Sequence, residues 1–266
     1  MPDKPDHEAP RDGAATTHFG YQEVPEAEKG ARVRGIFESV ASRYDLMNDL
    51  MSGGVHRLWK AAMIDWLNPR PGQCLVDVAG GTGDIALRVV ERVGAARCGP
   101  IVVCDLTPEM IARGRDRTID RGLLPGRSLA GPYWVCADAE RLPLPDRSMD
   151  AVTIAFGLRN VTRIEPALAE ARRVLRPGGR FLCLEFSRIA VPLLSELYDR
   201  YSFSVLPALG GLVTGDREAY LYLAESIRRF PAQDALAELM STAGLDQVRY
   251  RNLSGGIAAL HSGWRL

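Results

Sequence analysis

The chain has 266 residues and balances 33 Lys and Arg against 33 Asp and Glu, so its formal net charge at pH 7 is +0. A chain of this length can bury a substantial core, and it carries no overall field that would attract nucleic acid. It has five cysteines, an odd number that does not suit a disulfide framework, and none of them has a metal-binding spacing. We therefore expect a soluble cytoplasmic protein without a metal site or a membrane-spanning segment.

The first 30 residues are rich in proline, alanine and acidic residues and have no apolar centre. They are too acidic for a transit peptide and too polar for a secretory signal, so we expect a disordered tail over residues 1–30. From 31 to 70, apolar residues recur at helical spacing on both sides of Gly53 and Gly54. This stretch is expected to form a helical cap on the domain that occupies residues 31–266.

Beyond residue 70, short apolar runs alternate with amphipathic segments. The runs are QCLVDVAGG, PIVVCDL, YWVCADA, MDAVTIAFGL and GRFLCLEFS, and the amphipathic segments include DIALRVVERV and RIEPALAEARRVL. Apolar strands alternating with helices indicate an α/β fold with a parallel sheet covered on both faces. Thr107 and Pro108 are a favourable N-cap and first helical residue for the segment after PIVVCDL.

The glycine-rich segment VDVAGGTGDIA, residues 76–86, follows a predicted strand and opens a helix. Gly81, Thr82, Gly83 and Ala86 fit a G-x-G-x-x-A pattern, in which glycines let a ligand approach the backbone closely. Asp105 ends the next strand at the spacing expected for a carboxylate that binds ribose hydroxyls. Together these features predict a cofactor that contains adenosine.

The carboxylates around this loop indicate which cofactor it binds. Asp77 and Asp84 flank the loop, where they would repel a pyrophosphate and suit the ammonium and sulfonium groups of S-adenosylmethionine. Asp138 and Ala139 end the third strand and are placed to contact adenine. The pattern therefore favours a methyltransferase over a dehydrogenase. The cofactor-binding residues we expect are Asp77, Gly81, Thr82, Gly83, Asp105, Leu106, Asp138 and Ala139.

The run TIAFGLRNVT, residues 153–162, stops at two polar residues, Arg159 and Asn160. Thr162 and Glu165 form a T-x-x-E capping box, which predicts that a helix begins at about Arg163. Arg159 and Asn160 then occupy the loop at the carboxyl end of a strand, where open α/β sheets bind their ligands. The alternative is a solvated arginine beside an asparagine turn.

The chain resembles the quinone-biosynthesis C-methyltransferases that act on demethylmenaquinol and 2-polyprenyl-6-methoxy-1,4-benzoquinol. The matching stretches are VASRYDLMNDLMSGGVHRLWK, DVAGGTGD, FGLRNV, RVLRPGGRFLCLEFS, YLAESIRRFP and LSGGIAALHSGW. The resemblance implies a Rossmann-like class I methyltransferase fold with an antiparallel last strand, and cofactor contacts at Thr82, Asp105, Asp138 and Ala139. Many members have a serine before FGLRN, but this chain has Ala155, so we expect no cofactor contact there.

Methylation of a ring carbon needs an electron-rich ring, which deprotonation of a quinol hydroxyl supplies. Arg159 is our candidate to stabilise the phenolate oxygen, and Asn160 to orient a ring oxygen or a water. His56 is a candidate general base, with a structural histidine as the alternative. Tyr44 either forms a hydrogen bond to substrate or anchors the helix pair. Glu185 either reaches substrate or serves as a cap or as the partner of a nearby arginine.

Residues 190–230 interrupt the α/β alternation and place Leu193, Leu197 and Tyr201 at helical spacing. We expect a helical insertion near the substrate, formed either as core or as a wall for a prenyl tail. The expected partners are a polyprenylated quinol and, weakly, the inner face of the cytoplasmic membrane or a quinone-biosynthesis assembly, with no nucleic acid.

The sequence leaves open the choice of ring, benzoquinol or naphthoquinol, together with the tail length and the oligomeric state. Two other functions remain as alternatives. One is a class I methyltransferase for another small hydrophobic acceptor, because cofactor motifs do not identify acceptors. The other is a non-catalytic subunit of a quinone-biosynthesis assembly.

Overall fold

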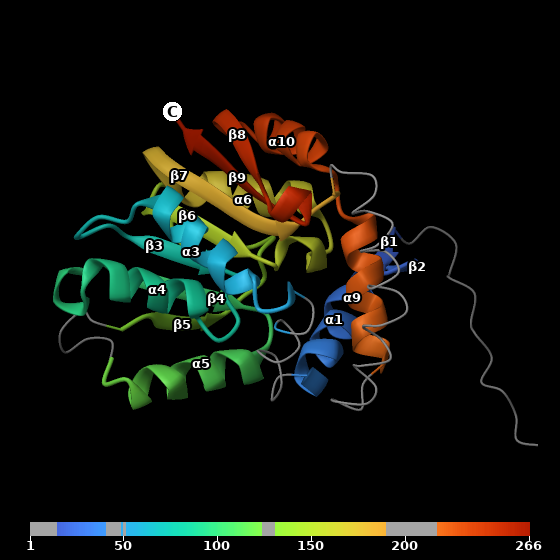
Figure 1. The fold of residues 1–266 in the computed structure, drawn as a ribbon, viewed down its shortest axis with the longest axis horizontal. Coiled ribbons are helices and arrows are strands. Elements are labelled where there is room, and N and C mark those ends of the chain that lie inside the picture. Colours follow the sequence, from blue (N-terminus) through green and yellow to red (C-terminus); the bar gives the residue numbers. More distant parts are fainter. Residues whose placement is uncertain (1–14, 41–48, 50–51, 124–130, 190–216) are drawn as a thin grey trace, which may run out of the picture.

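The structure, a computed structural model, describes residues 15–40, 49, 52–123, 131–189 and 217–266 (Figure 1). Within these residues, seven strands form one sheet in the order β5-β4-β3-β6-β7-β9-β8. Their bounds are β3 (Leu75–Val78), β4 (Ile101–Asp105), β5 (Tyr133–Cys136), β6 (Met149–Ala155), β7 (Leu175–Phe186), β8 (Asp246–Leu253) and β9 (Ala258–Arg265). The first five strands in this order are parallel, and β9 is antiparallel to both of its neighbours. The predicted fold class is confirmed.

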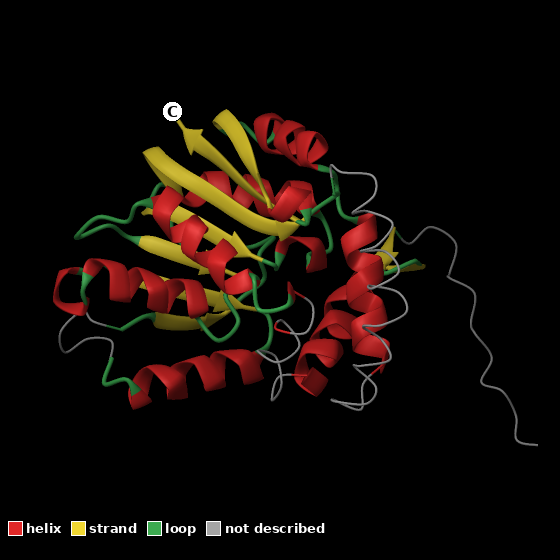
Figure 2. Ribbon diagram, in the orientation of Figure 1, coloured by secondary structure: helices red, strands yellow, loops and turns green. Residues whose placement is uncertain are grey.

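Helices cover both faces of the sheet (Figure 2). They are α3 (His56–Leu67), α4 (Asp84–Val93), α5 (Pro108–Asp120), α6 (Ile164–Val174) and α10 (Gln233–Thr242). Helices α3 and α4 share one buried cluster with the sheet, and α6 and α10 share the other. In α4, Ile85, Val89 and Val93 recur at helical spacing and are buried, whereas Arg92 lies on the solvent side.

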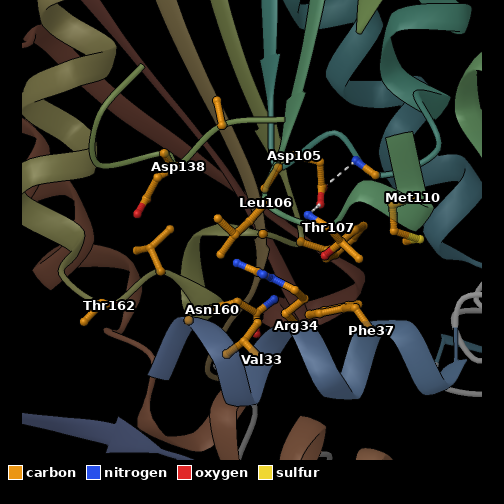
Figure 3. Close-up of a pocket in the computed structure, with 18 residues that line it drawn as sticks. Val33, Arg34, Phe37, Asp105, Leu106, Thr107, Met110, Asp138, Asn160 and Thr162 are labelled. Atoms are coloured by element: carbon orange, nitrogen blue, oxygen red, sulfur yellow. Dashed lines mark hydrogen bonds between the residues drawn. The ribbon is translucent and has the colours of Figure 1, made fainter. Parts of the chain in front are cut away.

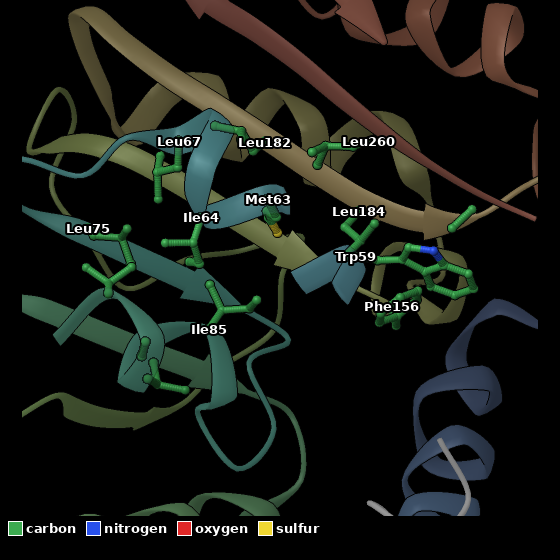
Figure 4. Close-up of a cluster of buried hydrophobic side chains, with 14 of the residues drawn as sticks. Trp59, Met63, Ile64, Leu67, Leu75, Ile85, Phe156, Leu182, Leu184 and Leu260 are labelled. Atoms are coloured by element: carbon green, nitrogen blue, oxygen red, sulfur yellow. The ribbon is translucent and has the colours of Figure 1, made fainter. Parts of the chain in front are cut away.

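Helix α3 belongs to the core of the domain. Met63 and Ile64 are fully buried and pack in the same cluster as Leu182 and Leu184 of β7 (Figure 4). Burial of each such side chain contributes about 1.5–3 kcal/mol relative to leaving it in water. The predicted helical cap of residues 31–70 is therefore not one unit. Its second helix, α3, packs on the sheet as part of the core.

The N-terminal part forms a hairpin and a helix where the sequence predicted a disordered tail. These elements are β1 (Thr16–Phe19), β2 (Gln22–Pro25) and α1 (Glu26–Val40). The hairpin finds partners far along the chain: the Tyr21 N–H donates to Glu225 at 3.0 Å, and the Thr17 hydroxyl donates to the Thr162 carbonyl at 3.1 Å. The predicted tail is therefore wrong for residues 16–30, and residues 1–14 lie outside the described part.

Glu225 belongs to α9 (Arg217–Arg229), which lies beside α1 and β1 (Figure 1). Helix α9 is the C-terminal part of the helical insertion predicted over residues 190–230. Leu193, Leu197 and Tyr201 lie outside the described residues. Within the described residues, no helix is both long enough and apolar enough to cross a membrane.

Both predicted helix starts lie within one residue of those observed, but the predicted capping box is absent from the second. Thr107 is the N-cap of α5 and Pro108 its first residue, as predicted. The capping box of Thr162 and Glu165 does not form, because α6 begins at Ile164 with Arg163 as its N-cap and without a side-chain cap. The Arg163 N–H instead donates to a Glu140 carboxylate oxygen at 2.8 Å, so this end of the helix already has an acceptor.

Trp134 of β5 lies against two glycines, and this contact gives a test of the packing. A Cβ at Gly114 would overlap the Trp134 ring, whereas a Cβ at Gly35 in α1 would meet nothing within 4 Å. Gly114→Ala is expected to destabilise the protein by about 1–3 kcal/mol through overpacking, although alanine is the better helix former. The control Gly35→Ala is expected to stabilise it by up to about 1 kcal/mol. Urea unfolding measures both, and equal effects would contradict this packing.

Candidate functional site

A pocket lies at the carboxyl ends of the parallel strands and is closed on one side by α1 (Figure 3). Several expected cofactor residues line it together with one expected catalytic residue: Gly81, Asp105, Leu106, Asp138, Ala139 and Asn160. The side of the pocket formed by the strand ends is therefore the one that sequence analysis predicted. In the part of the chain that the structure describes, no group of His, Cys, Asp or Glu is arranged to hold a metal ion.

Asp105 is held rigidly at the end of β4. One carboxylate oxygen accepts the Gly81 N–H at 2.8 Å and the other accepts the Thr107 N–H at 2.9 Å (Figure 3). Burial raises the pKa of Asp105 above its ordinary value, and these two amides oppose the shift. The amides fix the carboxylate at the pocket, where its remaining lone pairs can accept from ribose hydroxyls.

The glycine loop takes a conformation that larger residues resist. Gly81 and Gly83 have positive φ angles of 56° and 76°, which favour glycine. A Cβ at Gly83 would also lie 2.5 Å from the Trp134 ring. The loop can therefore turn tightly into α4, with Gly81 at the pocket and Gly83, an expected cofactor residue, packed against Trp134 instead of lining the pocket.

Helix α1 supplies a wall of the pocket that the sequence analysis did not identify. Gly30, Val33, Arg34 and Phe37 line the pocket at positions i, i+3, i+4 and i+7, which is one face of a helix. Figure 3 shows Arg34 and Phe37 pointing from α1 into the pocket. The helical spacing was visible in the sequence, but the direction of this face was not, because it depends on how α1 docks.

Asp77 and Thr82 lie beside a second, smaller cavity under the glycine loop, rather than in the main pocket. Asp77 is buried and accepts the Thr153 hydroxyl at 2.8 Å. Burial raises its pKa to about 7, against the opposing effect of that hydrogen bond. Lys60, also buried, forms a 2.8 Å ion pair with Asp84 at the same cavity.

Arg159 does not line the pocket in this structure. Its guanidinium is buried and forms a 2.8 Å ion pair with Glu185, and it also donates to the Phe156 carbonyl. The Arg159 backbone N–H donates to the second Glu185 oxygen. Of the two alternatives for Glu185, pairing with an arginine is the one observed. This pair holds the turn η3 (Leu158–Asn160), which follows β6.

Asn160 follows Arg159 on the turn and does reach the pocket. Its side-chain carbonyl accepts the Tyr222 hydroxyl of α9 at 3.1 Å. In the sequence analysis, Tyr222 belongs to the stretch YLAESIRRFP that matches the family, but no role was predicted for it. Its partner lies 62 positions away, so local pattern offered no signal for this contact.

His56 also does not line the pocket. It is buried at the start of α3, where its Nδ1 lies 2.9 Å from the Ser52 hydroxyl and 3.7 Å from Asp49. Burial lowers the pKa of His56 below its ordinary value. The geometry favours the alternative of a structural histidine. Tyr44 lies outside the described residues.

The ubiE/COQ5 methyltransferase family model matches residues 25–265. The chain belongs to this family. It is 57% identical over 250 residues to the ubiquinone/menaquinone biosynthesis C-methyltransferase UbiE of Paracoccus denitrificans, which covers 94% of this chain and 97% of that protein. It is 53% identical to the mitochondrial 2-methoxy-6-polyprenyl-1,4-benzoquinol methylase of Oryza sativa subsp. japonica, with 94% and 88% covered.

The fold is also similar to solved methyltransferases. A SAM-dependent methyltransferase from Thermotoga maritima superposes with a TM-score of 0.61 at 19% identity, covering 88% of this chain and 100% of that one. Membership of the family confirms the predicted methyltransferase activity and S-adenosylmethionine as its cofactor.

The Arg159–Glu185 pair is buried, so removal of one partner should be costly. Glu185→Ala leaves the Arg159 guanidinium without its carboxylate and is expected to lower the free energy of unfolding by about 3–5 kcal/mol. The double variant Arg159→Met/Glu185→Leu removes both charges, and its free energy of unfolding should fall by much less. Urea unfolding of both proteins tests this, and a loss below about 1 kcal/mol for Glu185→Ala would show that the pair is not buried.

The raised pKa of Asp77 predicts a dependence of stability on pH. Between its ordinary value of 3.8 and about 7, the folded protein holds a proton that the unfolded chain has released, so stability falls as pH rises through this range. Asp77→Asn removes the ionisable group and keeps an acceptor for Thr153. Without cofactor, it should gain about 2–4 kcal/mol over the parent at pH 8 and less at pH 5. Thermal unfolding at both pH values measures this, with exposed Asp65→Asn as the control; a gain that did not depend on pH would contradict it.

Proposed function

We propose that the protein transfers a methyl group from S-adenosylmethionine to a ring carbon of a prenylated quinol in ubiquinone or menaquinone biosynthesis. The observation that carries the proposal is the composition of one pocket. At its strand-end side lie Asp105, Asp138 and Phe156, and α1 contributes the apolar side chains of Val33 and Phe37. A flat apolar ring fits against these side chains beside the cofactor. The names of the two relatives, a ubiquinone/menaquinone biosynthesis C-methyltransferase and a benzoquinol methylase, support the same acceptor class.

The residues present fit the cofactor in chemical type. We propose that Asp105 binds the ribose, and that Leu106, Asp138 and Ala139 bind the adenine. Gly81 allows close approach of the backbone, Gly83 lets the loop turn against Trp134, and Asp77 and Thr82 support the loop from the adjoining cavity. Bound there, S-adenosylmethionine supplies a methyl group activated by a sulfonium.

The chain's residues then have to activate and orient the acceptor. A quinolate ring is a better carbon nucleophile than a quinol, so a site that favours the ionised form accelerates transfer. Arg34 is the basic side chain among the pocket-lining residues that the structure describes, and its charge favours an anionic acceptor. Methyl transfer forms a carbon–carbon bond and breaks the sulfur–carbon bond, and the methylated ring carbon then gives its proton to solvent, which restores the aromatic ring.

We propose different roles for the two residues of the FGLRN stretch. Asn160 contacts the quinol, because its side chain lines the pocket. Arg159 stabilises the turn below, because its guanidinium is committed to Glu185. We expect only weak association with a membrane surface, since the chain has no excess of basic residues to attract anionic lipids.

The test is transfer of labelled methyl from S-adenosylmethionine to demethylmenaquinol and to 6-methoxy-1,4-benzoquinol analogues, both with short prenyl tails. Label on a ring carbon is expected with at least one ring, and the preferred ring identifies the substrate. Asp105→Asn is the matched control, because it should weaken cofactor binding and reduce transfer to both rings. Cofactor binding without transfer to either ring would contradict the quinol and point to another hydrophobic acceptor.

A further inference from the structure

Tyr222 of α9 reaches across to the turn that carries Asn160. The Tyr222 hydroxyl lies 3.1 Å from the Asn160 side-chain oxygen. The Tyr222 side chain is buried at 6% exposure, and its ring stacks on Phe19 with centroids 4.4 Å apart and an angle of 27°. The hairpin and α9 therefore hold the phenol ring in place, and the phenol oxygen can serve as a fixed point.

The direction of this hydrogen bond follows from the Asn160 atom that faces the phenol. That atom is the side-chain carbonyl oxygen, which can only accept, so the tyrosine donates. Burial raises the pKa of Tyr222 to about 12, so the hydroxyl keeps the proton that it donates at neutral pH. The NH2 group of the same amide is then directed away from Tyr222 and is available to the pocket that Asn160 lines.

The backbone beneath Asn160 is fixed independently of Tyr222. The Asn160 N–H donates to the Gly157 carbonyl at 3.0 Å, and the Arg159–Glu185 pair holds the same turn. The main chain therefore sets where the amide begins, whereas the tyrosine sets which end of the amide faces the ligand.

We propose that Tyr222 is a positioning residue that fixes the Asn160 amide so that its NH2 group donates to an oxygen of the quinol ring. The inference rests on the proposed function and adds a residue of α9, Tyr222, that orients Asn160. The Tyr222 phenol contacts Asn160, and of these two residues only Asn160 contacts the quinol. A donor aimed at a ring oxygen favours the ionised quinol and keeps the target carbon facing the methyl group.

A double-mutant cycle in the full-length chain tests the proposal. Tyr222→Phe keeps the stacking ring and removes only the hydroxyl. It is expected to lower kcat/KM for the quinol that the wild type methylates best by roughly tenfold, the size of one hydrogen bond, with Kd for S-adenosylmethionine within about twofold. Asn160→Ala should lose more. Adding Tyr222→Phe to Asn160→Ala should change activity by less than about twofold, because the amide to be oriented is gone.

The matched control is Tyr220→Phe, which removes a hydroxyl from the same helix at a residue of the hydrophobic core. Its activity should stay within about twofold of the wild type. Additive losses in the double variant, or a weaker cofactor Kd for Tyr222→Phe, would overturn the proposal and indicate a general packing role or a cofactor contact.

A readout without catalysis separates this proposal from the proposed function. The sequence has four asparagines, so selective ¹⁵N labelling gives few side-chain amide signals, and Asn160→Ala identifies the signal of Asn160. Tyr222→Phe should shift or broaden that signal in the cofactor-free protein. An unchanged signal would overturn the positioning role even if the wild type methylates a quinol. A shifted signal in a protein inactive on both rings would contradict only the function.

Discussion

The site depends on one physical constraint: a carboxylate buried at the end of a strand must be met by donors. Asp105, Asp77 and Glu185 lie at or near the ends of β4, β3 and β7; Asp77 and Glu185 are buried, and Asp105 is half-buried at the pocket. Glycine-loop amides meet Asp105, a threonine hydroxyl meets Asp77, and an arginine with backbone amides meets Glu185. The donors to Asp105 and Glu185 fix the glycine loop and the turn η3, which contribute to the strand-end side of the pocket, whereas the donor to Asp77 links β3 to β6.

The cofactor side of the pocket could be predicted because its signals are local. The buried parallel strands read as continuous apolar runs, and the glycine loop and Asp105 follow strands within a few residues. Sequence reasoning located Arg159 and Asn160 correctly at a strand end. It could not tell which would face the ligand, since that depends on Glu185, 26 positions further on.

The acceptor side could not be predicted in the same way. We propose that it is formed by α1, which packs on the N-terminal hairpin, and the hairpin in turn contacts α9 through residues up to 204 positions apart. The hairpin strands have four residues each and are mostly polar, so their pattern resembled a tail. His56 was a reasonable candidate by residue type, but its burial beside Ser52 is a property of packing.

The contacts of the hairpin also bear on the order in which the chain completes its fold. Residues 16–25 leave the ribosome well before their partners, because Thr17 bonds to Thr162, 145 positions later, and Tyr21 to Glu225, 204 positions later. Contacts of such wide separation form late, because a long loop must close before they contribute. The cofactor half, built from neighbouring strands and helices, can form during synthesis. The hairpin that supports α1 gains its partner in α9 only when α9 is released, so a chain arrested before that point would have the strand-end side of the pocket without a secured wall opposite it.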